Sequence, residues 1–418
     1  MIFYLIFGLT LLLWMISPLP LYVSGLIGLC LCALLEVAPL SKLLYGFAHP
    51  VIFLFLSGFL FARALEKSGL DQYFLSLGLK SKTFGKNSRS RLLYLLLIAF
   101  TLSGWISNTA TMAILLPLAF RLFDNHPELT SHRSFILLSL AYACAIGGGL
   151  TPIGSPPNAI AQGIIDPALA LSFFEWMLYA APLCLILFYF LTKDTLKRIP
   201  IMEYQGSDFI QKKLSSSQKW VMSIFALTVA FWVIPGIFKL LGSQSLAHLK
   251  STTVGLTGAT LLFLFKDENK VPILEGEDIK KIDWPSLFLF AEGISLGALL
   301  KDNIDLSPLG LQIPILGLIV LAIFICIFLT ELSSNTAIAS SVFPLIFAFT
   351  PEQYQAGLGL LLALACNSAF MLPIATPPNT IVYGTGLVSK TEMATLGLKY
   401  NILAATVFSL AAIMRMAV

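Results

Sequence analysis

Residues 107–111 read SNTAT and residues 334–338 read SNTAI, and both stretches interrupt long apolar segments at about 92–122 and 311–349. A polar triplet is costly at the centre of a membrane helix, because the bilayer core offers no water to its hydroxyl and amide groups. Each half of an interrupted segment is short for a separate crossing, since about 20 residues span a bilayer as a helix. The two segments therefore predict re-entrant hairpins whose tips line a cavity.

The composition indicates that the rest of the chain also lies in a membrane. Of the 418 residues, 57% are hydrophobic and 11% are charged, whereas about 25% are charged in an ordinary soluble domain. Ten further apolar segments lie at about 2–17, 20–38, 48–65, 134–165, 169–192, 219–240, 252–266, 284–300, 355–388 and 393–417. We expect an all-α polytopic membrane protein whose first segment is a retained span, because it has neither a positive n-region nor a cleavage site.

The basic residues predict the orientation. Ten crossings leave both termini on one side, and with the termini outside, 21 of the 26 Lys and Arg residues fall in cytoplasmic stretches. The five on the outer side are Lys42, Lys239, Lys250, Lys301 and Arg415. This asymmetry predicts a multi-pass protein of a bacterial inner (cell) membrane with both termini outside. Topology accounts for the basic loops, so we expect no nucleic-acid partner.

The order of segments occurs twice along the chain. Residues 1–192 form a first repeat and residues 219–418 a second, joined by a polar cytoplasmic linker at 193–218. The first repeat has scaffold spans at about 1–66, a hairpin at 92–122, a broken span at 134–165 and a span at 169–192, and the second has its hairpin at 311–349 and its broken span at 355–388. Five crossings per repeat insert the second repeat upside down, an arrangement typical of secondary transporters.

A proline pair breaks one span in each repeat, at GSPPN (154–158) and at ATPPN (375–379). Proline lacks an N–H group and disfavours helix at the preceding residue, so both spans unwind and free carbonyl oxygens that suit a hard cation such as Na⁺. The Ser-Asn-Thr triplets favour helix starts, whose free N–H groups attract anions. A cap or a kink alone could explain one motif, whereas two mirrored pairs predict one binding site shared by both repeats.

These motifs, together with LFLSGFLFARALEKSGL at 54–70, resemble those of the divalent anion:sodium symporter family, whose members move C4-dicarboxylates, citrate-type tricarboxylates or sulfate. The resemblance covers nearly the whole chain. It implies two inverted repeats of five transmembrane helices, each with a re-entrant hairpin and one unwound helix, in an elevator-type homodimer. Members commonly have one more amino-terminal span, and we expect this chain to begin at the first repeat.

The resemblance also implies the binding residues. The first Na⁺ site would use Ser103, Ser107, Asn108 and Gly154, and the second would use Thr330, Ser333, Asn335 and Ala375. The substrate carboxylates would be held by Ser107, Asn108, Thr109, Ser155 and Pro156 from one repeat and by Ser334, Asn335, Thr336, Thr376 and Pro377 from the other. Neither tip contains Arg or Lys, so helix dipoles, hydroxyls, amides and bound Na⁺ would balance the charge of a dianion.

The chain departs from the family pattern at FAEGIS (290–295), where members usually have a glycine-rich stretch. The departure places Glu292 inside a span, and a carboxylate within the membrane is a functional candidate by default. Two alternatives stay open: Glu292 binds a proton or an extra cation, or it lies near an aqueous edge or pairs with a lysine.

The expected function is secondary active transport, in which Na⁺ drives uptake of a small divalent anion, most simply a C4-dicarboxylate such as succinate, malate or fumarate. Na⁺-independent dicarboxylate exchange, or sulfate or citrate as substrate, are the alternatives. We do not expect an enzyme, because the sequence has no HExxH or GxSxG motif and no histidine near a proline break. A channel would need a continuous ring of pore-lining groups.

Overall fold

The computed structural model describes residues 2–70, 73–74, 77, 84, 86–125, 127–203, 214–243, 245–246, 248–303 and 314–416. Among these residues every regular element is a helix, beside two isolated β-bridges. Five helical stretches are long and apolar enough to cross a membrane: Glu128–Gly147, Phe173–Arg198, Ser216–Leu240, Ile315–Leu332 and Lys390–Met414. The all-helical polytopic membrane fold expected from the composition is therefore confirmed.

The two halves of the chain repeat the same order of helices. The first half contains α1 (Ile2–Ile16), α2 (Leu21–Leu34), α3 (Leu40–Leu43), η1 (Tyr45–Ala48), α4 (Pro50–Ser68), α6 (Ser88–Ser103), α7 (Asn108–Asn125), η2 (Pro127–His132), α8 (Arg133–Gly147), α9 (Pro156–Ile164) and α10 (Phe173–Arg198). The second half contains α11 (Ser216–Leu240), α12 (Ser251–Leu264), α13 (Gly276–Ile279), α14 (Trp284–Asn303), α15 (Ile315–Leu332), α16 (Asn335–Ala348), α17 (Glu352–Asn367), α18 (Pro377–Gly384) and α19 (Lys390–Met416).

Four helical segments are broken at the polar triplets and the proline pairs. Short turns separate α6 from α7 and α15 from α16, and the members of each pair contact one another as the arms of a hairpin. Longer loops separate α8 from α9 and α17 from α18, and both α9 and α18 begin at the first proline of their pair. Proline suits the first helical position because it has no N–H group to leave unsatisfied.

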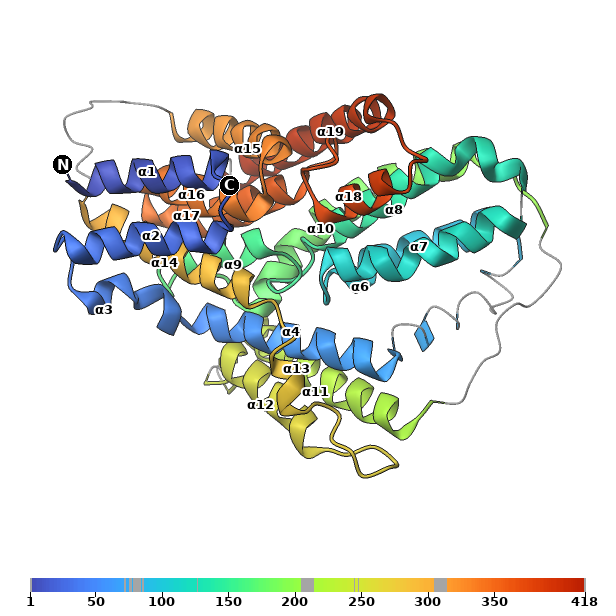
Figure 1. Cartoon of the computed structure of the whole chain (residues 1–418), viewed down its shortest axis with the longest axis horizontal. Coiled ribbons are helices and arrows are strands. Elements are labelled where there is room, and N and C mark those ends of the chain that lie inside the picture. The colour runs from blue at the N-terminus through green and yellow to red at the C-terminus, as the bar shows by residue number, and fades with distance from the viewer. Residues whose placement is uncertain are drawn as a thin grey trace.

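Two groups of helices pack around these interruptions. In the first, α1 packs on α2, α2 on α14, and α4 on α12 and α11; Figure 1 shows α11 and α12 beneath α4. In the second, α8 packs on α6 and α10, and α15 packs on α17 and α19. Helices α15 and α19 lie along the opposite edge of the molecule in Figure 1. The hairpin arm α16 lies along α14, whereas its counterpart α7 packs on α6, α8 and α18. The first group is called the scaffold below.

Two helices extend beyond the lengths expected from the sequence. Helix α10 continues to Arg198, past the expected end at 192, and the basic side chains of its last turn complement the helix dipole. Helix α15 has 18 residues and is, by length and composition, able to cross a membrane, so this arm of the hairpin is longer than expected. Residues 204–213 of the expected linker and 311–313 of the second hairpin segment lie outside the described residues.

Candidate functional site

One cavity of 640 Å³ brings the two triplets and the two proline pairs together. Its walls include residues 107–109 and 334–336 from the hairpin tips, and 154–156 and 375–377 from the broken spans. Scaffold helices α2, α4 and α14 close the other side. The volume falls within the range of about 300–1,000 Å³ that is usual for small-molecule sites. All ten residues predicted to hold substrate therefore line a single space.

At the first hairpin tip, the triplet starts helix α7. The hydroxyl oxygen of Ser107 accepts a hydrogen bond from the backbone N–H of Ala110 at 3.1 Å, which is the geometry of a helix cap. The hydroxyl of Ser103 donates to the side-chain oxygen Oδ1 of Asn108. The Asn108 oxygen is thereby fixed toward the end of α6, and a Cβ added to Gly148 would lie only 2.7 Å from it.

The first broken span is tied to this tip through backbone oxygens. The buried amide of Asn158 donates to the carbonyl oxygens of Gly148, at 2.9 Å, and Thr151, at 2.8 Å. The hydroxyl of Thr151 donates in turn to the carbonyl oxygen of Gly104. A Cβ built on Gly154 would lie 2.6 Å from the Gly148 oxygen and 3.0 Å from the Gly104 oxygen. The carbonyl oxygens of Gly148 and Gly104 therefore both lie beside Gly154, and the side-chain oxygen of Asn108 lies beside Gly148.

The second hairpin tip repeats this arrangement. The hydroxyl of Thr330 donates to the side-chain oxygen of Asn335 at 2.5 Å, and the carbonyl oxygen of Cys366 lies 3.3 Å from the same hydroxyl. Ser334 occupies the cap position of α16 but makes no side-chain cap hydrogen bond. In the second broken span, the hydroxyl oxygen of Thr376 accepts from the backbone N–H of Asn379 at 3.3 Å.

Two functional candidates in the second repeat were not predicted from the sequence. Asn367, at the end of α17, accepts a hydrogen bond from the Ser155 hydroxyl at 2.6 Å and donates to the side-chain oxygen of Asn158 at 3.0 Å. It therefore joins the second repeat to the broken span of the first. An amide between two membrane helices was the signal in the sequence that could have identified it.

The other candidate is Glu331, which is 3% exposed and directly follows Thr330 in α15. Its carboxylate accepts hydrogen bonds of 2.6–3.0 Å from the backbone N–H groups of residues 370, 371 and 372, and one of 2.6 Å from the amide of Asn401. These four donors belong to the unwound loop between α17 and α18 and to helix α19. A carboxylate inside a span was the available signal in the sequence, as it was for Glu292.

Of the remaining predicted residues, two line the cavity and four do not. Gly154 and Ala375 line it, whereas Ser103 and Thr330 are buried directly behind the tips. Ser333 ends α15 in an extended conformation and is not among the lining residues. Glu292 is fully buried outside the cavity, and neither of its oxygens has a protein hydrogen-bond partner among the described residues. The alternative of an aqueous edge or a paired lysine for Glu292 was therefore wrong.

Most polar groups of the cavity lie on the hairpin tips and broken spans, and none of its described lining residues is basic. Among its described lining residues Asp283 is the only charged one, and it caps α14 through a 3.1 Å hydrogen bond from the backbone N–H of Ser286. No group of three or more His, Cys, Asp or Glu side chains that could hold a metal ion occurs in the described part of the chain. A cation in this cavity would instead meet carbonyl, hydroxyl and amide oxygens, which are the ligands of hard cations. An anion would meet the starts of helices and their N–H donors.

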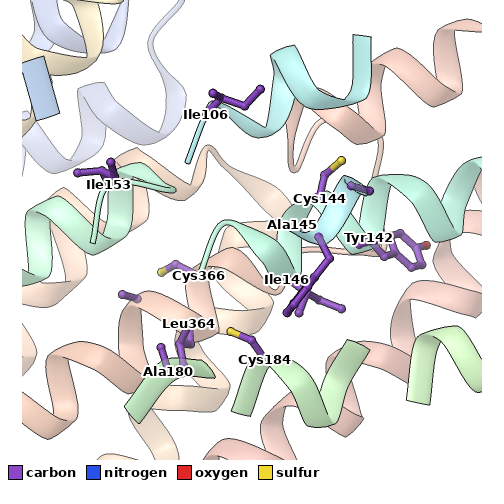
Figure 2. Close-up of a cluster of buried hydrophobic side chains, with 14 of the residues drawn as sticks. Ile106, Tyr142, Cys144, Ala145, Ile146, Ile153, Ala180, Cys184, Leu364 and Cys366 are labelled. Carbon is purple, nitrogen blue, oxygen red and sulfur yellow. The ribbon is translucent and has the colours of Figure 1, made fainter. Parts of the chain in front are cut away.

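A closely packed core supports the loops that form the cavity. Figure 2 shows Ile106 and Ile153, from the two loops of the first repeat, together with side chains of α8, α10 and α17 such as Tyr142, Cys184 and Leu364. Gly149 lies in the same region, where an added Cβ would be 2.5 Å from a Leu364 methyl group. Such packing holds irregular backbone in one conformation at membrane depth, where water cannot satisfy it.

The fold and the site together define a multi-pass membrane transporter. The chain matches the family model described as CitMHS, citrate transporter, over residues 11–366, and it belongs to that family. It is 30% identical to the sodium-dependent dicarboxylate transporter SdcS of Staphylococcus saprophyticus, over 95% of this chain and 82% of that protein. The resemblance to sodium-coupled anion transporters predicted from the sequence is therefore confirmed, and the protein is a transporter, not an enzyme.

Further proteins match nearly the whole length of the chain. The chain is 34% identical to an uncharacterized transporter of Methanocaldococcus jannaschii, over 96% of this chain and 91% of the other, and 32% identical to one of Haemophilus influenzae, over 95% and 88%. Among solved structures, that of the Alcanivorax borkumensis YdaH transporter, described as having an unusual topology, superposes with a TM-score of 0.55 at 16% identity and covers 99% of this chain and 98% of its own. This last likeness concerns the fold alone.

Proposed function

We propose that the protein couples Na⁺ to the uptake of a small divalent anion, with a C4-dicarboxylate such as succinate, malate or fumarate as substrate. The observation that carries the proposal is the single cavity in which all ten predicted substrate residues meet. Two helices, α7 and α16, begin at its wall, and their free N–H groups and dipoles favour negative charge. The name of the sodium-dependent dicarboxylate relative points in the same direction.

Na⁺ would bind at the two places where side-chain oxygens of a tip meet an unwound loop. In the first repeat these oxygens belong to Ser103, Asn108 and the carbonyl groups of Gly104 and Gly148. In the second they belong to Thr330, Asn335 and the Cys366 carbonyl group. Because the described lining residues of the cavity include no Lys or Arg, bound Na⁺ would supply the positive charge that a dianion requires for affinity.

The proposed movement is of the elevator type. The hairpins and broken spans would travel as one body against the scaffold, carrying the cavity between them, and we propose that two copies assemble through their scaffolds. The asymmetric packing supports a movement of this kind, since α16 lies along α14 while α7 packs on α6, α8 and α18. With the termini outside, the exposed cavity residues Asp283 and Pro285 would face the cytoplasm, which corresponds to an inward-facing state.

The proposal is tested by replacing one tip amide at a time in protein reconstituted into liposomes. Asn108→Ala and Asn335→Ala should each lower kcat/KM for labelled succinate about tenfold or more, because a lost hydrogen bond to a charged ligand is worth about 1.5–3 kcal/mol. Both variants should also need more Na⁺ for half-maximal uptake. Asn269→Ala, in an exposed loop remote from the cavity, is the matched control. Unaltered uptake in both tip variants would refute the assignment of the site.

Two further measurements separate this function from its alternatives. Uptake into empty liposomes that is accelerated by an inward Na⁺ gradient supports symport, whereas uptake that needs preloaded dicarboxylate and ignores Na⁺ indicates exchange. Competition of unlabelled succinate, malate, fumarate, citrate and sulfate against labelled succinate identifies the substrate class. Stronger competition by citrate or sulfate than by any C4-dicarboxylate would change the proposed substrate while leaving the site intact.

A further inference from the structure

Glu292 occupies an unusual position in the scaffold. It lies about 12 Å along the axis of α14 from the start of that helix, and its side chain is fully buried. The carboxylate points at α2, where a Cβ added to Gly25 would lie 2.0 Å from its Oε2 atom. Glycine at position 25 thus makes the space that the carboxylate fills. Neither oxygen has a hydrogen-bond partner within the described protein.

Two buried hydroxyl groups near the contacts of α14 with α2 and α16 are also without partners among the described residues. Ser24 adjoins Gly25 in α2, and its buried hydroxyl makes no hydrogen bond with any described residue. On the other side, a Cβ added to Gly293 would lie 2.9 Å from the hydroxyl oxygen of Ser340 in α16, and this hydroxyl is likewise buried and unpartnered. Glu292 therefore lies between two scaffold helices, one residue from the contact with a hairpin arm.

The charged groups on the surrounding elements are engaged elsewhere. Lys42 of α3 pairs with Asp302 at the far end of α14, at 2.8 Å, and Arg63 and Lys67 of α4 pair with Asp278. Helices α9 and α16 contain no ionisable side chain. The other ionisable groups on elements that contact α14, none of them hydrogen-bonded to the carboxylate, are Tyr4, Tyr22, Cys30, Cys32, Tyr45, His49, Glu66, Asp283 and Lys301.

An ionised carboxylate in such a place would be strongly disfavoured. Burial of an unpaired charge costs several kcal/mol or more, and a buried acid relieves this cost by taking up a proton. A metal cation is a poorer explanation, because hard cations such as Ca²⁺ and Mg²⁺ take about six or more oxygen ligands, and no group of three or more His, Cys, Asp or Glu side chains that could hold a metal ion occurs among the described residues. A proton needs no such shell.

We propose that Glu292 is a proton-binding site of the scaffold, and that loss of this proton opposes the movement of α16 along α14. The neutral acid allows α2 and α14 to pack through Gly25 and allows the hairpin arm to lie over Gly293. An ionised carboxylate would draw water into this contact and separate the helices. Transport then becomes dependent on pH through a residue that does not touch the cavity. The transport part of this inference rests on the proposed function, whereas the binding of the proton does not.

Protonation of Glu292 is tested by infrared difference spectroscopy on purified protein at neutral pH without substrate. Wild-type protein should show the carbonyl stretching band of a protonated carboxylic acid, shifted in heavy water, and the near-isosteric Glu292→Gln variant should lack it. Glu128→Gln, which removes an exposed carboxylate at the start of η2, should leave the band unchanged. A band that survives in Glu292→Gln overturns the proposal, and so does its absence from the wild-type protein.

The consequence for transport is measured with the same variants in liposomes. Wild-type uptake should fall at alkaline pH, approaching about tenfold per pH unit as expected for one ionising group, while uptake by Glu292→Gln should stay constant because its side chain is permanently neutral. A Glu292→Gln profile that follows the wild type overturns this part. If no anion is transported by the wild-type protein at any pH, the proposed function fails, whereas the infrared result still decides whether Glu292 binds a proton.

Discussion

Asn158 and Asn379 hold the two unwound loops with the same pair of hydrogen bonds. Each side-chain amide donates to the carbonyl oxygens of the residues ten and seven positions before it, at 2.9 and 2.8 Å in the first repeat and at 3.2 and 3.1 Å in the second. The hairpin tips show a matching identity, because Ser103 and Thr330 each donate to an asparagine five positions later. The cavity is therefore built from one local structure used twice.

The first prediction concerns these two amides. Asn158→Ala and Asn379→Ala each leave two carbonyl oxygens of a buried loop without a donor, so each should destabilise the protein by about 2–6 kcal/mol, at about 1–3 kcal/mol for each unsatisfied group. The thermal midpoint of the purified protein in detergent should fall in both variants. Because the loops also provide the proposed Na⁺ ligands, excess Na⁺ should raise the thermal midpoint of the wild type but raise that of the variants only a little. Equal stability of the variants and the wild type would contradict the proposed role.

The second prediction concerns Asn367, which breaks the symmetry of the repeats. By the offset of 221 residues between Asn158 and Asn379, its counterpart is Ile146, which has no polar group. Because Asn367 accepts a hydrogen bond from the Ser155 hydroxyl, it fixes the position of Ser155 in the cavity wall. Asn367→Ala should raise KM for succinate about tenfold, as loss of one strong hydrogen bond does.

A double-mutant cycle checks this coupling through the paired variants Asn367→Ala and Ser155→Ala. If the two side chains act as a unit, the double variant loses little more than either single variant. Strictly additive losses would show that Asn367 does not act through Ser155.

Much of the fold and the site could be predicted because membrane burial makes the local signals strong. The breaks at the triplets and proline pairs fall where expected, since caps and prolines determine helix ends from nearby residues alone. Asn367 was missed because its partners are 209 and 212 residues away, and nothing local reveals such a pairing. Glu331 carried a usable signal, a carboxylate within a span, whereas its role in holding residues 370–372 follows only from tertiary structure.

The third prediction concerns Glu331. In Glu331→Gln one carboxylate oxygen becomes an amide group, which faces N–H donors instead of accepting from them, so the loop at 370–372 loses part of its anchor. We expect the Na⁺ concentration for half-maximal uptake to rise about tenfold, because Thr330 and the Cys366 carbonyl group adjoin this loop. Glu352→Gln, in which an exposed carboxylate that pairs with Lys301 is replaced, should leave it unchanged. Unchanged Na⁺ dependence in Glu331→Gln would show that the carboxylate has no role in cation binding.

The fourth prediction concerns Asp278, which joins the short helix α13 to the last turns of α4. Burial by itself raises the pKa of this carboxyl, but the ammonium of Lys67, the backbone N–H of Glu275 and the guanidinium of Arg63 outweigh burial and lower the pKa below its usual value. The stabilisation is therefore complete above the ordinary pKa of aspartate, about 4, and is lost as the pH falls through the lowered pKa. Asp278→Asn should reduce stability by about 2 kcal/mol at neutral pH.

Thermal unfolding of the wild type and of Asp278→Asn, measured between about pH 3 and pH 7, checks both parts of this prediction. The two midpoints should differ at neutral pH and converge at the acid end, where the wild-type carboxylate is also protonated. A difference that persists unchanged into acid would mean that packing, and not the charge of Asp278, provides the stabilisation.

The fifth prediction concerns the approach of α6 to α8 behind the first Na⁺ site. A Cβ added to Gly147 would lie 2.1 Å from the backbone oxygen of Phe100, so Gly147→Ala forces the two helices apart and should cost about 1–3 kcal/mol. The displaced helix end leads directly into Gly148, whose carbonyl oxygen faces the point beside Gly154. Na⁺ affinity should therefore fall together with the thermal midpoint.

A matched substitution separates this steric effect from a general effect of alanine. Gly317 lies in α15 with no other atom within 4 Å of its added Cβ, so Gly317→Ala should leave both quantities unchanged or raise stability slightly, because alanine favours helix. If Gly147→Ala lowers stability without altering Na⁺ dependence, the end of α8 can move independently of the loop, and the Gly148 oxygen is not a ligand. If both fall in parallel, the close contact of Gly147 with Phe100 sets the position of that oxygen.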